Sequence, residues 1–437
     1  MPPTFVIVGA SLAGGTAAAT LRQNGFDGDV TLVGQEPHPP YERPPLSKQY
    51  LRGEVPFEKA LVRPSGFYEA NRIDTRFGVA ATRIDPAART VALADGGSVR
   101  YDKLLIATGV RNRRPPIPGL DLQNVFDLRS VGDADAIRAA IVPGRKAAVI
   151  GMGFIGCEVA ASLRQKGIDV VCIDPAPAPL FRVLGEQIGQ VMSAIHREHG
   201  VETLFDDSVL RFEGGERVER VITARGRRVD CDFAVVGVGV EPVVEVVADS
   251  GVETSNGILV DEYCRTNVQD IYAAGDVAHH YHPGFQKRMR VEHWQNAMQQ
   301  GAAAARSMLG KAEPYAPIHW FWSDQYDVNL QYAGFHQAWD QIVVRGNLDS
   351  RNFLACYLSQ GRIDAVVGLN RGKDVRRIMP LINARTAVDL HQLADEGVDL
   401  RSLVGDHLSL APRASGANVR AVSKTLRRAI ARAVEEP

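Results

Sequence analysis

Two glycine-rich loops constrain this sequence more than any other feature. They read VIVGASLAGG from Val6 and AVIGMGFIGCE from Ala148, and each follows a short apolar run and opens an alanine-rich segment of helical length. A strand, a glycine turn and a helix form the unit that binds the diphosphate of a dinucleotide. Two such units predict two bound nucleotides, and two nucleotides in one chain predict that electrons pass from one to the other.

The bulk properties of the chain exclude several classes of protein. Its 437 residues are too many for one core, so more than one domain is expected. A net charge of −1 gives no field that would attract nucleic acid, and we expect no nucleic-acid partner. The chain shows neither a signal-peptide pattern nor an apolar run of membrane-span length. We therefore expect a cytoplasmic protein with no membrane span.

The cysteines predict neither a metal site nor a redox-active dithiol. There are five of them, and none forms a CxxC pair or a spacing typical of metal ligands. We expect buried, reduced thiols at Cys157, Cys172, Cys231, Cys264 and Cys356.

The first loop predicts a strand over 6–8 and a helix over 12–23. Gly9 allows the tight turn, Gly14 allows the helix to pack closely on the strand, and Ser11 stands where a middle glycine is usual. Glu36 follows the next apolar run and suits a ribose diol, although an exposed loop glutamate is the alternative.

A proline-rich loop, HPPYERPPLSK, follows the first unit. It carries Arg43 and Lys48, and two cations on a stiff loop beside a diphosphate site suit an anionic cofactor. A rigid surface loop is the alternative interpretation.

The second loop contains the complete GxGxxG pattern, with a strand predicted over 147–150 and a helix over 154–165. Asp174 ends the following strand. An acid there accepts hydrogen bonds from both ribose hydroxyls and repels a 2′-phosphate, which favours NADH over NADPH. Glu158, in the first helical turn, either complements the helix dipole or contacts the nicotinamide end of the dinucleotide.

Three further segments identify a family. They are YDKLLIATGVR from Tyr101, DIYAAGDVA from Asp270 and HWFWSDQYDVNLQYAG from His319. Together with the glycine loops and YERPPLSK, the chain resembles the FAD-dependent NADH:ferredoxin reductases of bacterial oxygenase systems. The resemblance implies an α/β fold of two Rossmann-like dinucleotide-binding domains of the glutathione-reductase-like type plus an α+β C-terminal domain. The expected divisions are an FAD-binding domain at 1–112 and 239–314, an NADH-binding domain at 113–238, a C-terminal reductase domain at 315–405, and a tail at 406–437.

The same resemblance assigns site residues. Those expected to bind FAD are Gly9, Ser11, Ala13, Gly14, Glu36, Arg43, Lys48, Ala80, Thr108, Gly109, Arg129, Asp276 and Trp294. Those expected to bind NADH are Gly151, Gly153, Phe154, Ile155, Glu158, Asp174, Arg182 and Gly239. Trp294 is expected to begin a helix whose positive end faces the flavin.

The implied reaction passes a hydride from NADH to N5 of FAD and then two single electrons to a ferredoxin that feeds a cytochrome P450 or a Rieske oxygenase. Lys48, paired with Glu158, would tune the flavin, and Trp322 would line the exit for electrons, with a core aromatic as the alternative. A rubredoxin reductase, an NADH oxidase and a flavoprotein with a signalling or interaction role are the other functions considered.

Two basic clusters are candidates for docking an acidic ferredoxin: Arg111, Arg113 and Arg114, and Arg371, Lys373, Arg376 and Arg377. Either cluster could instead be a solvated face. NVRAVSKTLRRAIARAVEE in the tail predicts a basic amphipathic helix from Asn418, which packs on its own domain or contacts a membrane or partner. The expected assembly is a monomer or a homodimer.

Overall fold

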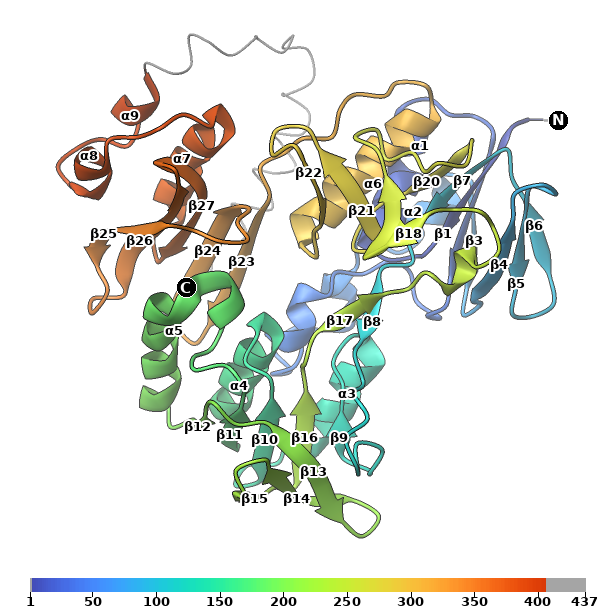
Figure 1. The fold of residues 1–437 in the computed structure, drawn as a ribbon. Helices are drawn as coiled ribbons and strands as arrows, with labels where there is room; N and C mark the ends of the chain where they lie inside the picture. The colour runs from blue at the N-terminus through green and yellow to red at the C-terminus, as the bar shows by residue number, and fades with distance from the viewer. Residues whose placement is uncertain (1, 406–437) are drawn as a thin grey trace.

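The computed structural model describes residues 2–405, so the basic helix predicted in the tail lies outside the described residues. Figure 1 shows three lobes, each built around one five-stranded sheet. The first sheet lies on the right of the view, the second below and the third at the upper left. This α/β arrangement, with a separate C-terminal sheet, is the fold class that the sequence predicts.

The first sheet is parallel and has the order β20-β7-β1-β2-β3. Its strands are β1 (Thr4–Val8), β2 (Asp29–Gly34), β3 (Ile73–Phe77), β7 (Lys103–Ile106) and β20 (Ile271–Ala273). Two helices, α1 (Leu12–Gln23) and α6 (Trp294–Met308), pack against each other beside it. The sheet therefore joins an early and a late segment of the chain. We call the part of the protein built on this sheet the first unit.

The second sheet is also parallel and has the order β12-β11-β10-β16-β9. Its strands are β9 (Val125–Phe126), β10 (Lys146–Ile150), β11 (Asp169–Ile173), β12 (Glu202–Leu204) and β16 (Phe233–Val236). Its helices are α3 (Val131–Ala140), α4 (Phe154–Gln165) and α5 (Phe181–Glu198), the last kinked at Gly185. In this second unit β10 occupies the central place that β1 has in the first.

Two short antiparallel strands connect the units. They are β8 (Val110–Asn112) and β17 (Val240–Pro242), with Arg111 opposite Glu241. The chain crosses between the units at this pair (Figure 1), close to the boundaries predicted at 112 and 239. The boundaries themselves stay a prediction.

The third sheet is antiparallel, with the order β23-β24-β27-β26-β25. Its strands are β23 (Trp320–Gln325), β24 (Val328–Gly334), β25 (Gln341–Asn347), β26 (Asn352–Ser359) and β27 (Arg362–Leu369). It is followed by α7 (Gly372–Ala384), α8 (Leu390–Ala394) and α9 (Ser402–Gly405). We call this part the C-terminal unit.

Smaller sheets and short helices complete the fold. The sheets are β4 (Ala81–Asp85), β5 (Thr90–Leu93) and β6 (Ser98–Arg100); β13 (Val209–Gly214), β14 (Val218–Thr223) and β15 (Arg228–Asp230); and β18 (Thr254–Ser255), β19 (Gly257–Val260), β21 (Ala278–His282) and β22 (Lys287–Arg290). The short helices are η1 (Pro44–Ser47), η2 (Phe57–Ala60), α2 (Phe67–Ala70) and η3 (Glu245–Val247).

The five cysteines are buried free thiols, which confirms the prediction made for them. Within residues 2–405, no helix is both long enough and apolar enough to cross a membrane.

A cluster of histidines fills the junction between the first unit and the C-terminal unit. The His319 ring lies 5.5 Å from the rings of both His280 and His282, and 6.3 Å from that of His293. Burial lowers the pKa of His280 and of His293 to about 3, and it also lowers the pKa of His282 and His319. The junction is therefore packed with neutral imidazoles at pH 7.

These histidines predict a stability that depends on acid pH. Their folded-state pKa lies below the value of 6.5 for an exposed imidazole, so the unfolded chain binds more protons below that pH. Stability should be complete above pH 6.5 and fall by about 1.4 kcal/mol per pH unit for each of His280 and His293 as the pH decreases toward 3. Urea unfolding from pH 7.5 to pH 5 measures this loss.

The variant His280→Phe should reduce that pH dependence by about one proton, whereas a control change at the exposed His391, His391→Gln, should leave it unchanged. A wild-type stability that does not fall between pH 7 and 5 would contradict the assignment of neutral histidines at the junction.

Candidate functional site

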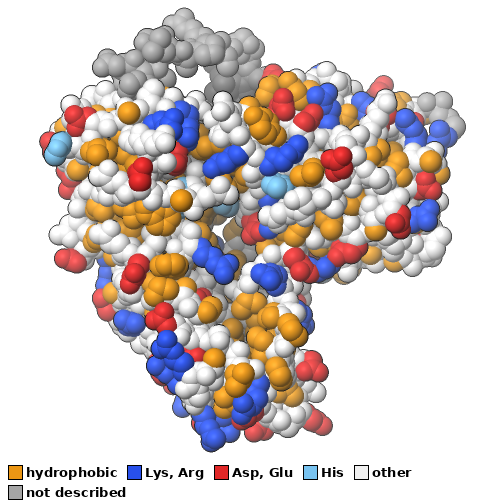
Figure 2. Space-filling view, viewed as in Figure 1, with side chains coloured by type: hydrophobic (Ala, Val, Ile, Leu, Met, Phe, Trp, Pro, Cys, Tyr) orange, Lys and Arg blue, Asp and Glu red, His pale blue; other side chains and the backbone are white. Residues whose placement is uncertain are grey.

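A cleft of about 550 Å³ lies where the first unit, the second unit and the C-terminal unit meet. Figure 2 shows a hollow at this meeting point, with Lys and Arg side chains on its border. Many of the predicted site residues line the cleft: Ser11, Ala13, Arg43, Lys48, Thr108, Gly109, Arg129, Phe154, Ile155, Glu158, Arg182, Asp276, Trp294 and Trp322. The fold thus brings together residues from both predicted nucleotide sites and from the C-terminal unit.

The glycines of the two loops lie behind the cleft and are required by close backbone packing. Gly9 has a φ of +113°, and a Cβ atom there would lie 2.1 Å from the carbonyl oxygen of Ala107. A Cβ atom on Gly14 would lie 1.9 Å from the Gly9 oxygen. Gly151, with a φ of +91°, and Gly156 have the same tight contacts in the second unit. Both loops therefore hold a helix N-terminus close to the end of a central strand, where its free N–H groups can bind phosphate.

Several buried N–H groups in the cleft fit a ligand rich in oxygen, such as FAD. The Nε atoms of Arg43 and Arg129 and the Nε1 atom of Trp294 have no hydrogen-bond partner among residues 2–405. Burial, and then the neighbouring Arg43 charge, lower the pKa of Arg129. Each guanidinium already binds one carboxylate, Glu36 at 2.7 Å and Asp276 at 3.2 Å. A bound diphosphate would add the missing acceptor, and its negative charge would offset the repulsion between the two cations.

Glu36 and Ala80 lie outside the lining of the cleft, Glu36 shortly after β2 and Ala80 shortly after β3. The backbone N–H of Gly78 donates to the Glu36 carbonyl oxygen at 3.0 Å. The Glu36 carboxylate accepts hydrogen bonds from Tyr41 Oη and from Arg43 Nη2. Tyr41 was not among the predicted residues, although it stands two positions before Arg43 in the proline-rich loop. Burial is the main reason that its pKa rises to about 12, so its hydroxyl stays a donor.

Thr108, Gly109 and Gly239 lie where the chain crosses between units. Thr108 Oγ1 donates to the Val243 carbonyl oxygen at 2.7 Å, and the backbone N–H of Val243 donates to the Gly109 oxygen at 3.0 Å. Gly239 has a φ of +104°, and its oxygen accepts from the Arg113 N–H at 3.0 Å. These contacts fix the two crossings against one another beside the cleft.

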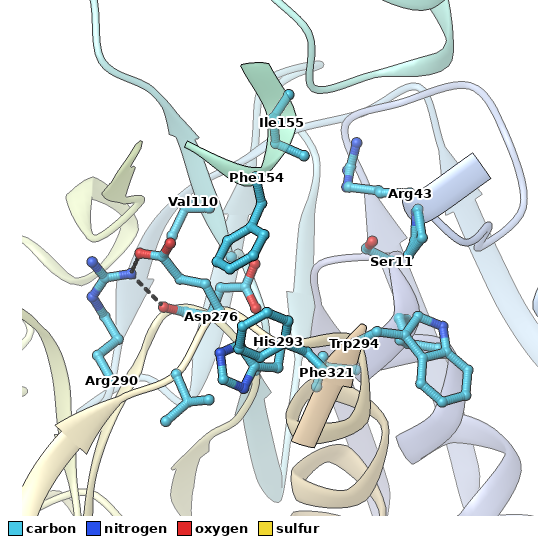
Figure 3. Close-up of a pocket in the computed structure, with 18 of the residues that line it drawn as sticks. Ser11, Arg43, Val110, Phe154, Ile155, Asp276, Arg290, His293, Trp294 and Phe321 are labelled. Carbon is cyan, nitrogen blue, oxygen red and sulfur yellow. Dashed lines mark hydrogen bonds and ion pairs between the residues drawn. The ribbon is translucent and has the colours of Figure 1, made fainter. Parts of the chain in front are cut away.

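The N-terminus of α4 opens into the cleft. A Cβ atom added to Gly153 would meet nothing within 4 Å, so a ligand can approach the backbone there. Ile155 is 45% exposed, and Figure 3 shows it above Phe154, whose ring points toward Phe321 and His293. The Phe154 and Phe321 rings are 4.7 Å apart in an edge-to-face arrangement. This apolar floor suits a flat aromatic group such as a nicotinamide or an isoalloxazine.

Asp174 is anchored at the end of β11. Its carboxylate accepts backbone N–H donors from Met152 at 2.5 Å and from Ala176 at 2.7 Å. These bonds hold a negative charge beside the second glycine loop. Arg182, at the start of α5, is exposed and also lines the cleft.

Lys48 and Glu158 form the ion pair that the family resemblance suggested. Lys48 Nζ lies 2.9 Å from Glu158 Oε1, and their side chains are only 6% and 4% exposed. Ser47 Oγ donates to Glu158 Oε2, and Ser323 Oγ donates to Glu158 Oε1 at 2.7 Å. Three donors therefore satisfy a buried carboxylate, which would otherwise be costly to bury.

Trp322 lines the cleft and stacks on Trp320, with ring centres 5.4 Å apart. The ring centres of Trp294 and Trp322 lie 5.9 Å apart, and Lys48 Nζ lies 6.0 Å from the ring centre of Trp322. The two tryptophans of β23 thus lead away from the ion pair along one face of the strand. Helix α6 begins at Trp294, as the sequence predicted.

Several further residues of the cleft were not predicted: Tyr41, Arg290, Glu292, His293, Phe321, Tyr332 and His336. Arg290 pairs with Glu292 at 2.6 Å and donates to the Asp276 carbonyl oxygen at 3.3 Å, as Figure 3 shows. Burial raises the pKa of Glu292. The segment RVEHW before α6 contains a charge on either side of an apolar residue, but that pattern alone is common on surfaces.

Comparison with known proteins gives a consistent family. The chain matches the family described as pyridine nucleotide-disulphide oxidoreductase over residues 3–301 and the one described as reductase C-terminal over residues 320–404. Rhodocoxin reductase of Rhodococcus erythropolis is 38% identical over 92% of this chain and 95% of its own. The anthranilate 1,2-dioxygenase system ferredoxin--NAD(+) reductase component of Burkholderia cepacia is 41% identical over 92% of this chain and 99% of its own.

Solved structures agree with these relatives. The reductase in the covalent putidaredoxin reductase–putidaredoxin complex has a TM-score of 0.90 and 33% identity, covering 93% of this chain and 99% of that one. The ferredoxin reductase for the CYP199A2 system from Rhodopseudomonas palustris has a TM-score of 0.88 and 35% identity, covering 91% and 99%. The chain belongs to the pyridine nucleotide-disulphide oxidoreductase family and carries its reductase C-terminal domain.

Proposed function

We propose that this protein is an FAD-dependent NADH:ferredoxin oxidoreductase that supplies electrons to an oxygenase, either a cytochrome P450 or a Rieske enzyme. The observation that carries the proposal is the shared cleft, in which the ends of two dinucleotide-binding units face one another across the Lys48–Glu158 pair. The relatives named as ferredoxin--NAD(+) reductase components support the same reaction.

FAD, when bound, supplies a carrier that accepts two electrons as a hydride and releases them one at a time. Arg43 and Arg129 would hold its diphosphate, and Lys48 would place a positive charge beside its reactive ring. Phe154 and Phe321 exclude water from the apolar floor, which favours close contact between two flat rings. The protein therefore contributes alignment and charge rather than a side-chain nucleophile.

Anaerobic stopped-flow mixing with NADH and with NADPH tests this function. We expect fast bleaching of the flavin by NADH and much slower bleaching by NADPH, because the Asp174 carboxylate repels a 2′-phosphate. Asp174→Asn removes the charge but keeps an acceptor for a backbone N–H. It should weaken NADH binding and raise the NADPH-to-NADH ratio of kcat/KM by about tenfold or more. Flavin that NADH leaves oxidised would overturn the proposal.

The arrangement of charges favours α7 as the docking surface for ferredoxin. Trp320 Nε1 donates to Gln331 Oε1 at 3.3 Å, and Gln331 packs directly on Gly372 at the start of α7. Lys373 and Arg376 are exposed on this helix and form no ion pair with any other residue in 2–405. A carrier bound there would lie next to the stacked tryptophans.

Four of the five other cations in the two clusters are paired, and Arg113 is exposed with no ion pair among residues 2–405. Arg111 binds Glu241 at 2.7 Å and also Glu245, and Arg114 binds Asp127 at 3.3 Å. Arg371 and Arg377 both bind Asp374, at 2.7 and 2.8 Å. Paired cations attract an acidic partner less than free ones do.

Salt and charge reversal test this docking surface, with putidaredoxin as the carrier. Lys373→Glu/Arg376→Glu should slow carrier-dependent cytochrome c reduction by about tenfold at low salt and reduce its dependence on ionic strength, because steering raises association rates. Arg111→Glu, which reverses one paired cation of the other cluster, is the control and should have a smaller effect. Reduction of the flavin by NADH should not change in either variant. A larger effect from Arg111→Glu would place docking at the crossing instead.

We also propose a cytoplasmic location, which the five buried free thiols support, since such thiols are typical of a reducing compartment.

A further inference from the structure

Strand β23 presents two different faces to its surroundings. Trp320 and Trp322 stack on one face, as described above. Phe321, Ser323 and Gln325 alternate with them and point the other way, and Ser323 and Gln325 are each only 1% exposed. This second face contacts α4, where Ser323 reaches Glu158, and α5, where Gln325 reaches His196.

A chain of hydrogen bonds runs along this face from α5 to the ion pair. Tyr326 Oη lies 3.2 Å from His196 Nδ1, and His196 Nε2 lies 3.0 Å from Gln325 Oε1. Gln325 Nε2 donates to Ser323 Oγ at 3.1 Å, and Ser323 Oγ donates to Glu158 Oε1 at 2.7 Å. Every side chain from His196 to Glu158 is nearly or fully buried.

The donors in this chain all point toward Glu158. Burial lowers the pKa of His196 to about 4, so the ring is neutral at pH 7 and carries one N–H. The Gln325 oxygen needs a donor, which puts that proton on Nε2 and leaves Nδ1 to accept from Tyr326. The Gln325 amide then turns its NH₂ group to Ser323, whose only proton is left for the carboxylate. Hydrogen bonds aligned in one direction polarise one another and stabilise the negative charge at their end.

We propose that Ser323, oriented by Gln325 and His196, is a positioning residue that holds the Glu158 carboxylate and through it the Lys48 ammonium group at the cleft. Glu158 Oε1 accepts from both Ser323 and Lys48, so the serine shares this oxygen with the lysine and offsets part of its negative charge. With the serine present, Lys48 keeps an N–H available for the cleft. Without it, the carboxylate would draw Lys48 closer and weaken the positive charge that the lysine presents there.

The inference rests on the proposed function, because its readout is the bound flavin. The primary variant is Ser323→Ala, and Ser323→Thr restores the hydroxyl. Ser193→Ala is the matched control, since Ser193 is a buried serine on α5 whose Oγ has no hydrogen-bond partner within residues 2–405. The measurements are the midpoint potential of the flavin, by equilibrium titration with a reference dye, and the bleaching rate at saturating NADH.

Ser323→Ala should shift the midpoint potential to a more negative value. It should also slow bleaching at saturating NADH by about tenfold, the size expected for one hydrogen bond to a charged group, while the Kd for NADH stays the same. Ser323→Thr should recover most of both losses, and Ser193→Ala should match the wild type. If Ser323 had a purely structural role, Ser323→Ala would change the bleaching rate and the Kd for NADH together, and Ser323→Thr would not restore them.

Unchanged potential and rate in Ser323→Ala would overturn the proposal. If Ser323→Ala fails to bind flavin, the variant Gln325→Met tests the proposal in its place. It keeps the Ser323 hydroxyl but removes both hydrogen bonds of the Gln325 amide. It should give the same direction of shift, and a wild-type potential in it would also overturn the proposal. Failure of the proposed function is distinguishable, because the wild-type flavin itself would then remain oxidised with NADH.

Discussion

The buried ion pair between Lys48 and Glu158 is the interaction on which the arrangement of the three units depends. Lys48 comes from the first unit, Glu158 from α4 of the second, and Ser323 of the C-terminal unit completes the set of donors. Loss of either charged partner leaves an unpaired buried charge, which costs about 3–5 kcal/mol. The pair therefore penalises any arrangement that separates the units, and the cleft keeps its shape because the pair lies in its wall.

The two nucleotide-binding units have the same arrangement of strand, glycine turn and helix. In each, a glycine of positive φ directly follows the central strand, and a second glycine five residues later lets the helix pack on the first glycine's oxygen. Ligands of parallel sheets bind outside the carboxyl ends of the strands. Because both loops lie beside the same cleft, the reactive ends of two dinucleotides can meet there without a covalent intermediary on the protein. The C-terminal unit adds the aromatic side chains that cover this meeting point and lead away from it.

Local sequence predicted the elements that local chemistry determines. The helices predicted over 12–23 and 154–165 have those bounds in the structure, because a glycine turn fixes each start and the apolar pattern fixes each length. Contacts between distant segments were not predictable in this way. His280 and His319 meet across the junction of two units, and Tyr41 binds Glu36 through a turn that no periodicity indicates. Ser323 lies in the HWFWSDQ segment that helped to identify the family, but only the structure shows that its face of β23 points at Glu158.

The most direct test of the account is the midpoint potential of the flavin in Lys48→Met, compared with the wild type and with Lys48→Met/Glu158→Gln. Lys48→Met removes a positive charge at nearly constant volume, and the double variant also removes the unpaired carboxylate that the single variant leaves buried. We expect a more negative potential in both variants, with lower thermal stability only in the single one. A wild-type potential in Lys48→Met, together with unchanged bleaching by NADH, would contradict the central place given to this ion pair.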